Sequence, residues 1–268
     1  MVELKLDQIG VQVASVDGGS RWILEDISCT CRSGERLGII GRNGSGKTTL
    51  ARLIGGLDGP TRGTLQVQPK DVRIMLALQR PEDHFIRETV GQQIASYASQ
   101  RLEKAAVQSL LARVGLSPNL ENYAPRRLSS GHQRLVAIAC TLAAKPSFIV
   151  LDEPMAGLDS YGRHLVAQAL TQLNRDQRLG LILISHHPDD LLGLVERLWI
   201  LEEGRLLYDG PFERAPVAVL SKCLSPDDNS LYYALRKLED RGISLPGSVY
   251  HTARPDEISE LLLRDHIC

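Results

Sequence analysis

The segment GRNGSGKTT at residues 41–49 constrains the possible folds of this chain more than any other feature. It matches the pattern G-x-x-x-x-G-K-[ST], follows the apolar run RLGII at 36–40 and precedes a predicted helix over 47–55. A short, almost continuous apolar run is typical of a buried parallel strand. In that context the glycines let successive backbone N–H groups turn inward around a phosphate. The sequence therefore predicts a nucleotide-binding loop between a buried strand and a helix.

The residue types in this loop predict separate roles around a triphosphate. Lys47 can neutralise oxygens of the β- and γ-phosphates, and the hydroxyl of Thr48 can ligate Mg²⁺. The glycines leave room for the backbone to approach the phosphates closely. The residues that we expect to contact the nucleotide here are Gly41, Arg42, Asn43, Gly44, Ser45, Gly46, Lys47, Thr48 and Thr49.

A second pattern, FIVLDEP at 148–154, is an apolar strand that ends in two adjacent carboxylates. Burial of uncompensated acids costs free energy, so a cation or hydrogen-bond donors must compensate them. We expect Asp152 to hold Mg²⁺ through a water molecule, and Glu153 to face the γ-phosphate and polarise the attacking water. A solvated strand end is the alternative, and the neighbouring phosphate loop disfavours it.

Two further polar residues, Gln79 and His186, follow predicted strands, VRIMLAL and LILIS. A neutral histidine at such a strand end can donate a hydrogen bond to a γ-phosphate. Taken alone, either residue would be an ordinary loop residue. Their functional interpretation therefore depends on the two motifs described above.

A second possible phosphate cradle lies in LSSGH at 128–132. Ser129, Ser130 and Gly131 open a predicted helix, so free N–H groups and two hydroxyls point outward together. One nucleotide needs only one such cradle. The second one raises the question of whose phosphate it binds.

Strand and helix patterns alternate along the chain, which predicts an α/β fold. Alternating strands fill the first third, a helical block spans about 79–145, and strands return at 148–154 and in LGLILIS, with a hairpin around 202–205. We therefore expect one domain over 1–215 with the helical block inserted in it. Residues 216–268 form a short C-terminal extension with a weaker pattern.

Charge and hydropathy disfavour binding to nucleic acid and a membrane-spanning segment. The net charge is −1, which gives no general attraction to nucleic acid. No apolar run approaches the roughly 18 residues of a membrane-spanning helix, and the first ten residues lack a signal-peptide core. We expect a protein that serves a membrane only through a partner.

Together these residues resemble an ATP-binding cassette (ABC) ATPase, from residue 2 to about 210. That family has a P-loop NTPase fold with a RecA-like core, an N-terminal antiparallel β-subdomain and an inserted helical subdomain. The resemblance makes 41–49 the Walker A loop, Gln79 the Q-loop glutamine and 128–132 the signature motif. It makes Asp159 part of the D-loop and His186 the switch histidine. It implies ATP and Mg²⁺, with Glu153, His186 and Gln79 as catalytic residues and Thr48, Gln79 and Asp152 around the metal.

The same resemblance accounts for the second cradle. In ABC dimers the signature of one chain covers the γ-phosphate that the Walker A loop of the other chain holds. Residues 129–132 would then bind a partner's nucleotide, with Ser129, Ser130, Gly131, His132 and Asp159 at the shared site.

The segment at 78–98 is similar to the Q-loop region of the ATPases in energy-coupling factor (ECF) importers. That similarity implies a motor subunit for uptake of a vitamin or transition-metal ion, on the cytoplasmic face of the cell membrane. The implied partners are a second ABC ATPase, a transmembrane coupling component and a substrate-binding membrane component, and no nucleic acid. Phe85 and Ile86 are expected to be buried against a membrane partner; the alternative is that both pack inside the helical subdomain.

This chain departs from the family pattern at three positions. The family signature reads L-S-G-G-Q, but here Ser130 replaces a glycine and His132 replaces the glutamine. The aromatic residue that commonly stacks on adenine is missing near Val13. The altered signature favours a heterodimer over a homodimer.

Three alternatives stay open at this point. The chain could belong to another class of ABC transporter, or be a soluble ABC protein that acts on nucleic acid or ribosomes. The lack of basic excess and of a second cassette disfavours the soluble class. A catalytically silent cassette is the third possibility, and the intact Glu153 disfavours it.

Overall fold

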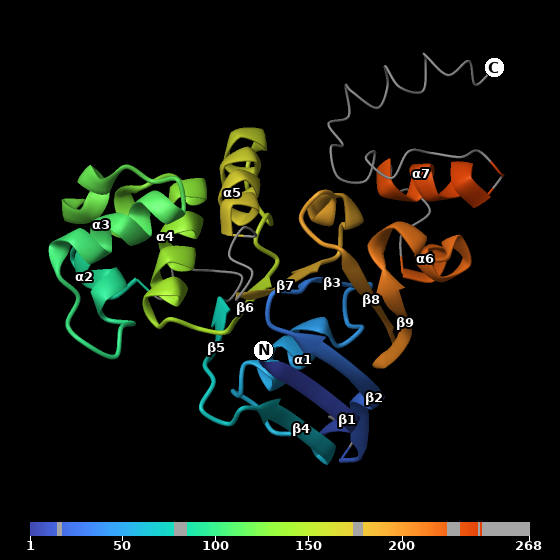
Figure 1. Cartoon of the computed structure of the whole chain (residues 1–268). Helices are drawn as coiled ribbons and strands as arrows, with labels where there is room; N and C mark the ends of the chain where they lie inside the picture. Colours follow the sequence, from blue (N-terminus) through green and yellow to red (C-terminus); the bar gives the residue numbers. More distant parts are fainter. Residues whose placement is uncertain (15–17, 78–84, 174–178, 224–230, 241, 243–268) are drawn as a thin grey trace, which may run out of the picture.

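The structure is a computed structural model that describes residues 1–14, 18–77, 85–173, 179–223, 231–240 and 242 (Figure 1). Its strands form two sheets, one of three strands in the order β2-β1-β4 and one of six in the order β5-β6-β7-β3-β8-β9. The predicted combination of an antiparallel N-terminal sheet with a mainly parallel sheet is confirmed.

The three-stranded sheet is antiparallel throughout and comprises β1 (Glu3–Ala14), β2 (Ser20–Arg32) and β4 (Arg62–Gln68). Its apolar face packs against helix α1 (Lys47–Ile54) and one face of the larger sheet. The pairing of β1 with β2 contains register shifts between Leu6 and Gln12. These irregularities interrupt the simple alternation that the sequence suggests.

Five strands of the larger sheet run parallel, and the sixth closes an antiparallel hairpin. Their bounds are β5 Ile74–Ala77, β6 Phe148–Asp152, β7 Gly180–Ser185, β3 Arg36–Ile40, β8 Arg197–Glu202 and β9 Arg205–Pro211. β6 and β7 are buried along their whole length, as expected for strands covered on both faces. Because parallel strands end at one edge of a sheet, the segments that follow β3, β6 and β7 meet there.

The helical block stands beside the larger sheet, as the green helices in Figure 1 show. It contains α2 (Val90–Ala95), α3 (Lys104–Arg113) and α4 (Ser130–Ala143). Apolar residues recur at helical spacing in α3 and α4, and they share one core with α5 (Ser160–Leu173): Val107, Leu111, Leu135, Ile138, Ala139 and Leu142 are buried, and Leu110 is partly buried. Gly115, with φ of 76°, follows α3 in the left-handed conformation that typically ends a helix.

Helices α6 (Val217–Cys223) and α7 (Leu231–Asp240) follow the hairpin. Short 3₁₀ turns occupy Pro118–Asn122, Pro125–Arg127, Pro188–Leu191 and Phe212–Arg214. Within the described ranges, no helix combines the length and the apolarity that crossing a membrane requires.

Candidate nucleotide-binding site

The phosphate loop lies between β3 and α1, where the sequence predicts it. Gly44 and Gly46 adopt φ of 84° and 100°, which glycine reaches without strain. A Cβ atom on Gly46 would approach the side chain of Leu24 to 2.7 Å, so the loop packs directly on β2. Lys47 is buried, and its Nζ donates to the carbonyl oxygens of Gly41 (2.7 Å) and Arg42 (3.0 Å).

Asp152 ends β6 directly beside the first turn of α1. The Thr48 hydroxyl donates to Asp152 Oδ2 at 2.9 Å, whereas Oδ1 is buried without a hydrogen-bond partner among the described residues. Burial raises the pKa of the Asp152 carboxyl, opposed by the Thr48 hydrogen bond and by the charge of Lys47. A hydroxyl beside an uncompensated carboxylate oxygen is the donor set that a hard cation such as Mg²⁺ prefers. The residues present therefore fit the metal.

Glu153 follows Asp152 and faces the end of β7. Its side chain shares a hydrogen bond of 2.7 Å between Oε1 and His186 Nδ1, and the Ser185 hydroxyl lies 3.5 Å from Oε2. The backbone of Glu153 has φ of 52°, a conformation that is uncommon for a residue with a side chain. The strand end thus holds a buried carboxylate in a defined position next to the phosphate loop.

A chain of polar contacts connects this carboxylate with helix α5. The Ser185 hydroxyl also donates to Asp190 Oδ2 (3.1 Å), and Arg163 on α5 donates to Asp190 Oδ1 (2.8 Å). Burial raises the pKa of Asp190, and the nearby guanidinium of Arg163 opposes that shift. Hydrogen bonds of this kind restrict the movement of Ser185 and Asp190, the side chains that connect Glu153 with α5.

A cavity of about 390 Å³ opens over these groups. The phosphate loop contributes Asn43, Gly44, Gly46, Lys47, Thr48 and Thr49 to its lining. Glu153 and His186 line a second wall, and Arg21 and Ile23 of β2 line a third. The structure therefore brings together the predicted loop, acid and histidine residues. No sequence pattern predicts Arg21 and Ile23 in the site, because they reach the cavity only through the packing of β2 on the loop.

The residues of the LSSGH segment lie elsewhere. Ser129 caps α4: its Oγ accepts from the N–H of His132 and shares a hydrogen bond of 2.6 Å with His132 Nδ1. A Cβ atom on Gly131 would come within 2.9 Å of Gly162 Cα, so α4 and α5 approach closely here. Among the described lining residues of the cavity, none comes from this segment.

Asp159 directly precedes helix α5, and its Oδ1 accepts a hydrogen bond of 2.7 Å from the N–H of Gly162. The side chain thus caps the helix, and it too is absent from the described lining of the cavity. Gln79 lies outside the described residues, so its predicted role is not placed by this structure.

The expectation that Phe85 and Ile86 both face a membrane partner is wrong for Phe85. Phe85 is 4% exposed and packs in the core of the helical block, whereas Ile86 is 74% exposed. Gln93 Oε1 accepts from the N–H groups of Ile86 and Arg87, and Arg126 donates to the carbonyl of Phe85. These contacts turn one of the two neighbours inward, so only Ile86 remains available to a partner.

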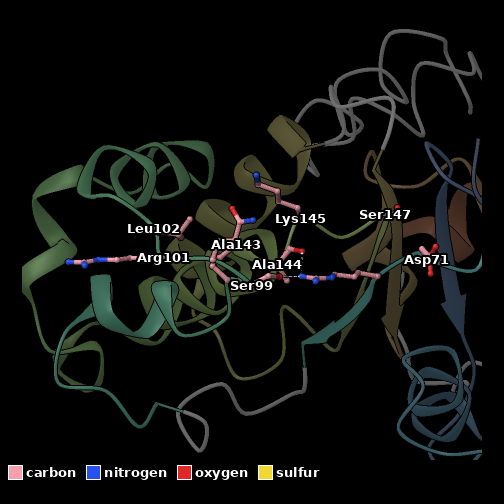
Figure 2. Close-up of a pocket in the computed structure, with 11 residues that line it drawn as sticks. Asp71, Ser99, Arg101, Leu102, Ala143, Ala144, Lys145 and Ser147 are labelled. Atoms are coloured by element: carbon pink, nitrogen blue, oxygen red, sulfur yellow. Dashed lines mark hydrogen bonds between the residues drawn. The ribbon is translucent and has the colours of Figure 1, made fainter.

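A second cavity, of about 340 Å³, lies at the amino ends of β5 and β6, away from the carboxylates (Figure 2). Its lining includes Arg73, Arg101 and Lys145, with Asp71 as the acidic member. Arg101 and Lys145 extend in different directions in Figure 2. Their charges do not converge on one point, and the cavity takes no part in the nucleotide site.

A family model described as ABC transporter matches residues 24–156. The energy-coupling factor transporter ATP-binding protein EcfA2 of Acetivibrio thermocellus is 34% identical to the chain over 203 residues, which cover 70% of this chain and 72% of that protein. The corresponding EcfA1 of Geobacillus kaustophilus is 32% identical, over 87% of this chain and 88% of that protein.

A solved structure of cbiO1 from Clostridium perfringens, described as part of the ABC transporter complex cbiONQ, superimposes with a TM-score of 0.70. It is 24% identical and covers 89% of this chain and 94% of that one. This likeness confirms the predicted fold class.

Proposed function

The chain belongs to the ABC transporter family, among the ATP-binding proteins of energy-coupling factor transporters, and we propose that its ATPase cycle drives uptake of a vitamin or a transition-metal ion. The observation that supports this proposal most is the meeting of three groups around one cavity. The phosphate loop with Lys47, the Thr48–Asp152 pair and the Glu153–His186 pair all line or adjoin it.

Each group has a chemical role in ATP hydrolysis. Lys47 exchanges its loop carbonyls for phosphate oxygens and offsets their charge. Glu153 accepts a hydrogen bond from the attacking water and polarises it, while His186 holds the carboxylate and reaches the γ-phosphate. Thr48 and Asp152 would hold Mg²⁺, which neutralises charge that develops on the phosphates.

The signature segment requires a second ATPase. We propose that Ser129, Ser130, Gly131 and His132, with Asp159 nearby, close over the ATP of a partner cassette, since they lie away from this chain's own cavity. The substituted signature supports a heterodimer. We also propose a transmembrane coupling component near Ile86 and a separate substrate-binding membrane component, with the cassette held on the cytoplasmic face of the membrane.

We propose the following domain limits for the chain. Residues 1–215 form the ATPase domain, with its helical part at about 79–145, and 216–268 form an extension. Within the domain, Gln79 is a catalytic and metal-binding residue.

A silent cassette or one acting on nucleic acid is the competing interpretation. The buried and hydrogen-bonded Glu153 and the net charge of −1 argue against both.

The test is ATP turnover in the assembled complex, purified by affinity from native membranes so that its partners are identified. Glu153→Gln should retain ATP binding and lose turnover, because only the polarisation of water is removed. Lys47→Ala should lose binding as well. Turnover at the wild-type rate in the Glu153→Gln complex would contradict the assigned base, and co-purification with ribosomes instead of membrane proteins would contradict the transport role.

A further inference from the structure

One wall of the nucleotide cavity belongs neither to the phosphate loop nor to the carboxylate end of the sheet. It is formed by Arg21 and Ile23 on β2. Arg21 pairs with Val13 of β1, and directly opposed residues of an antiparallel pair share one face of the sheet. Ile23 sits where the register shifts between the Val11–Leu24 and Gln12–Trp22 pairs. Its apolar side chain lines the same wall as the arginine.

The order of groups around the cavity fixes the direction of a bound nucleotide. Glu153 and His186 mark the end where a terminal phosphate reacts, and the loop at 43–49 surrounds the phosphate chain. A nucleoside triphosphate carries its base at the end opposite to the γ-phosphate. We therefore expect the base to contact the remaining described wall of the cavity, which β2 forms.

We propose that Arg21 is the nucleobase-binding residue of this chain, its guanidinium stacking on the face of the base while Ile23 covers an edge. The inference rests on the proposed function, because it assumes that the triphosphate occupies the phosphate loop. A guanidinium is planar and stacks on aromatic rings, with an added cation–π attraction. The guanidinium of Arg21 makes no ion pair or hydrogen bond with the described residues, so no protein group fixes the orientation of its plane.

The neighbouring tryptophan does not compete for this role. Trp22 points to the other face of the sheet, where its ring lies 5.7 Å from the guanidinium carbon of Arg62. A Cβ atom on Gly10 would approach that ring to 2.8 Å. Trp22 thus packs against Gly10 and Arg62, and it is absent from the described lining of the cavity.

A stacking arginine has a consequence for specificity. Every base has a π-face, so stacking tolerates changes of base, whereas discrimination needs hydrogen bonds to the base edge. Ile23 offers no hydrogen-bonding side chain. The ligand class is therefore a nucleoside triphosphate whose base this wall does not discriminate, and we expect ATP and GTP to bind with affinities within about fivefold of each other.

The experiment measures binding of ATP, GTP and inorganic triphosphate, each with Mg²⁺, to the full chain by calorimetry. Arg21→Ala and Arg21→Lys should weaken ATP binding about tenfold, because both lose the planar group. Arg21→Tyr should stay within about threefold of the wild type, because it restores a plane without the charge. Inorganic triphosphate should bind all variants equally. Arg62→Ala, which removes an exposed arginine from the opposite face, is the matched control and should change nothing.

Equal losses for ATP and inorganic triphosphate in Arg21→Ala would overturn the proposal, since Arg21 would then contact phosphate. Unchanged ATP affinity in that variant would overturn it too. A preference for ATP over GTP of more than about a hundredfold would contradict the expectation that the two nucleotides bind with similar affinity. Failure of the proposed function would give a different result: the wild type would bind neither ATP nor inorganic triphosphate, and Lys47→Ala would have no effect.

Discussion

Asp152 carries a buried charge that the fold must compensate until a cation arrives. Its pKa is raised above the ordinary value of 3.8, chiefly by burial. A carboxyl whose pKa is raised in the folded state contributes a stabilisation that is fully present below its unfolded pKa and is lost as pH rises through the folded pKa. Above the folded pKa the ionised side chain is therefore a local cost.

Asp152→Asn should stabilise the nucleotide-free chain at neutral pH while abolishing hydrolysis that depends on Mg²⁺. An amide keeps an oxygen for the Thr48 hydroxyl and removes the buried charge. Each pKa unit corresponds to about 1.4 kcal/mol, and each kcal/mol to about 2–4 °C in Tm for a chain of this size. Thermal unfolding at pH 7.5 and at pH 5 would measure this gain, which should shrink at the lower pH.

Asp159→Asn is the matched control for that substitution. Asp159 is exposed and caps α5, and asparagine caps helices about as well. Its Tm should stay within about 1 °C of the wild type. A Tm for Asp152→Asn below that of the wild type at neutral pH would contradict the account of the buried charge.

The signature segment differs from the family pattern in a way that the structure makes concrete. The hydroxyl of Ser129 is hydrogen-bonded to His132 within the chain, and Ser130 adds an exposed side chain at the first residue of α4. A hydroxyl engaged inside its own chain donates less well to a partner's γ-phosphate. We expect the site closed by this segment to hydrolyse ATP more slowly than its counterpart.

Ser130→Gly combined with His132→Gln should raise turnover at that site by roughly tenfold to a hundredfold. The figure corresponds to one charge-assisted contact of about 1.5–3 kcal/mol in the transition state. The measurement is the ATPase rate of a heterodimeric complex in which Glu153→Gln silences the site formed by this chain's own loop. No increase would show that the native segment is already competent, and the argument for a heterodimer would lose its support.

At the scale of elements, the short segment after β5 combines an inward and an outward apolar residue. Phe85 fills the core of the helical block, and Ile86 faces solvent on a backbone fixed by Gln93 and Arg126. An exposed isoleucine on a rigid turn can gain about 1.5–3 kcal/mol by burial against a partner. Phe85 therefore contributes to folding of the chain, whereas Ile86 is available for assembly with a partner.

Ile86→Asp should release the membrane partner and leave the Tm of the isolated chain unchanged. Phe85→Asp should destabilise the fold by at least about 3 kcal/mol, because it empties a buried aromatic site. Co-purification of the complex and thermal unfolding of the chain measure the two effects. Leu57→Asp, at another exposed apolar position, should affect neither. An intact complex in the Ile86→Asp variant would contradict the proposed contact.

Helix α7 contacts the turn that follows the histidine of the nucleotide site. Tyr232 of α7 stacks on Phe212, with ring centroids 4.2 Å apart, and its N–H donates to Asp189 Oδ1. Asp189 belongs to the 3₁₀ turn at Pro188–Leu191 that follows His186. Helix α7 thus packs on the turn that directly follows the histidine.

At the scale of the whole molecule, the nucleotide cavity and the signature segment at 128–132, which lies away from it, imply a dimer of ATPases that ATP holds together. With Glu153→Gln and ATP, the chain and its partner ATPase should form a stable dimer, because the γ-phosphate that joins them is not hydrolysed. Light scattering after size exclusion would measure it, and Lys47→Ala should remain monomeric. A dimer of this chain alone under the same conditions would instead indicate a homodimer.

Much of this protein could be predicted from local patterns. The apolar runs at β3, β6 and β7 and the glycine loop specify parallel strands followed by polar residues, so the meeting of Lys47, Asp152, Glu153 and His186 at one sheet edge follows from topology. The helical block was predictable from spacing, because its apolar positions recur at the helical period and most of them are buried in the structure.

The sequence by itself thus determined the phosphate loop, the acid pair and the fold class, since each depends on short segments whose chemistry is local. Only the tertiary structure decided the third wall of the cavity and the direction of Phe85. The packing of β2 on the phosphate loop sets which of its side chains line the nucleotide cavity, and packing in the core of the helical block sets which of two adjacent apolar residues is buried. Both outcomes depend on contacts between segments far apart in the chain, and the residues involved carry no local pattern that distinguishes them.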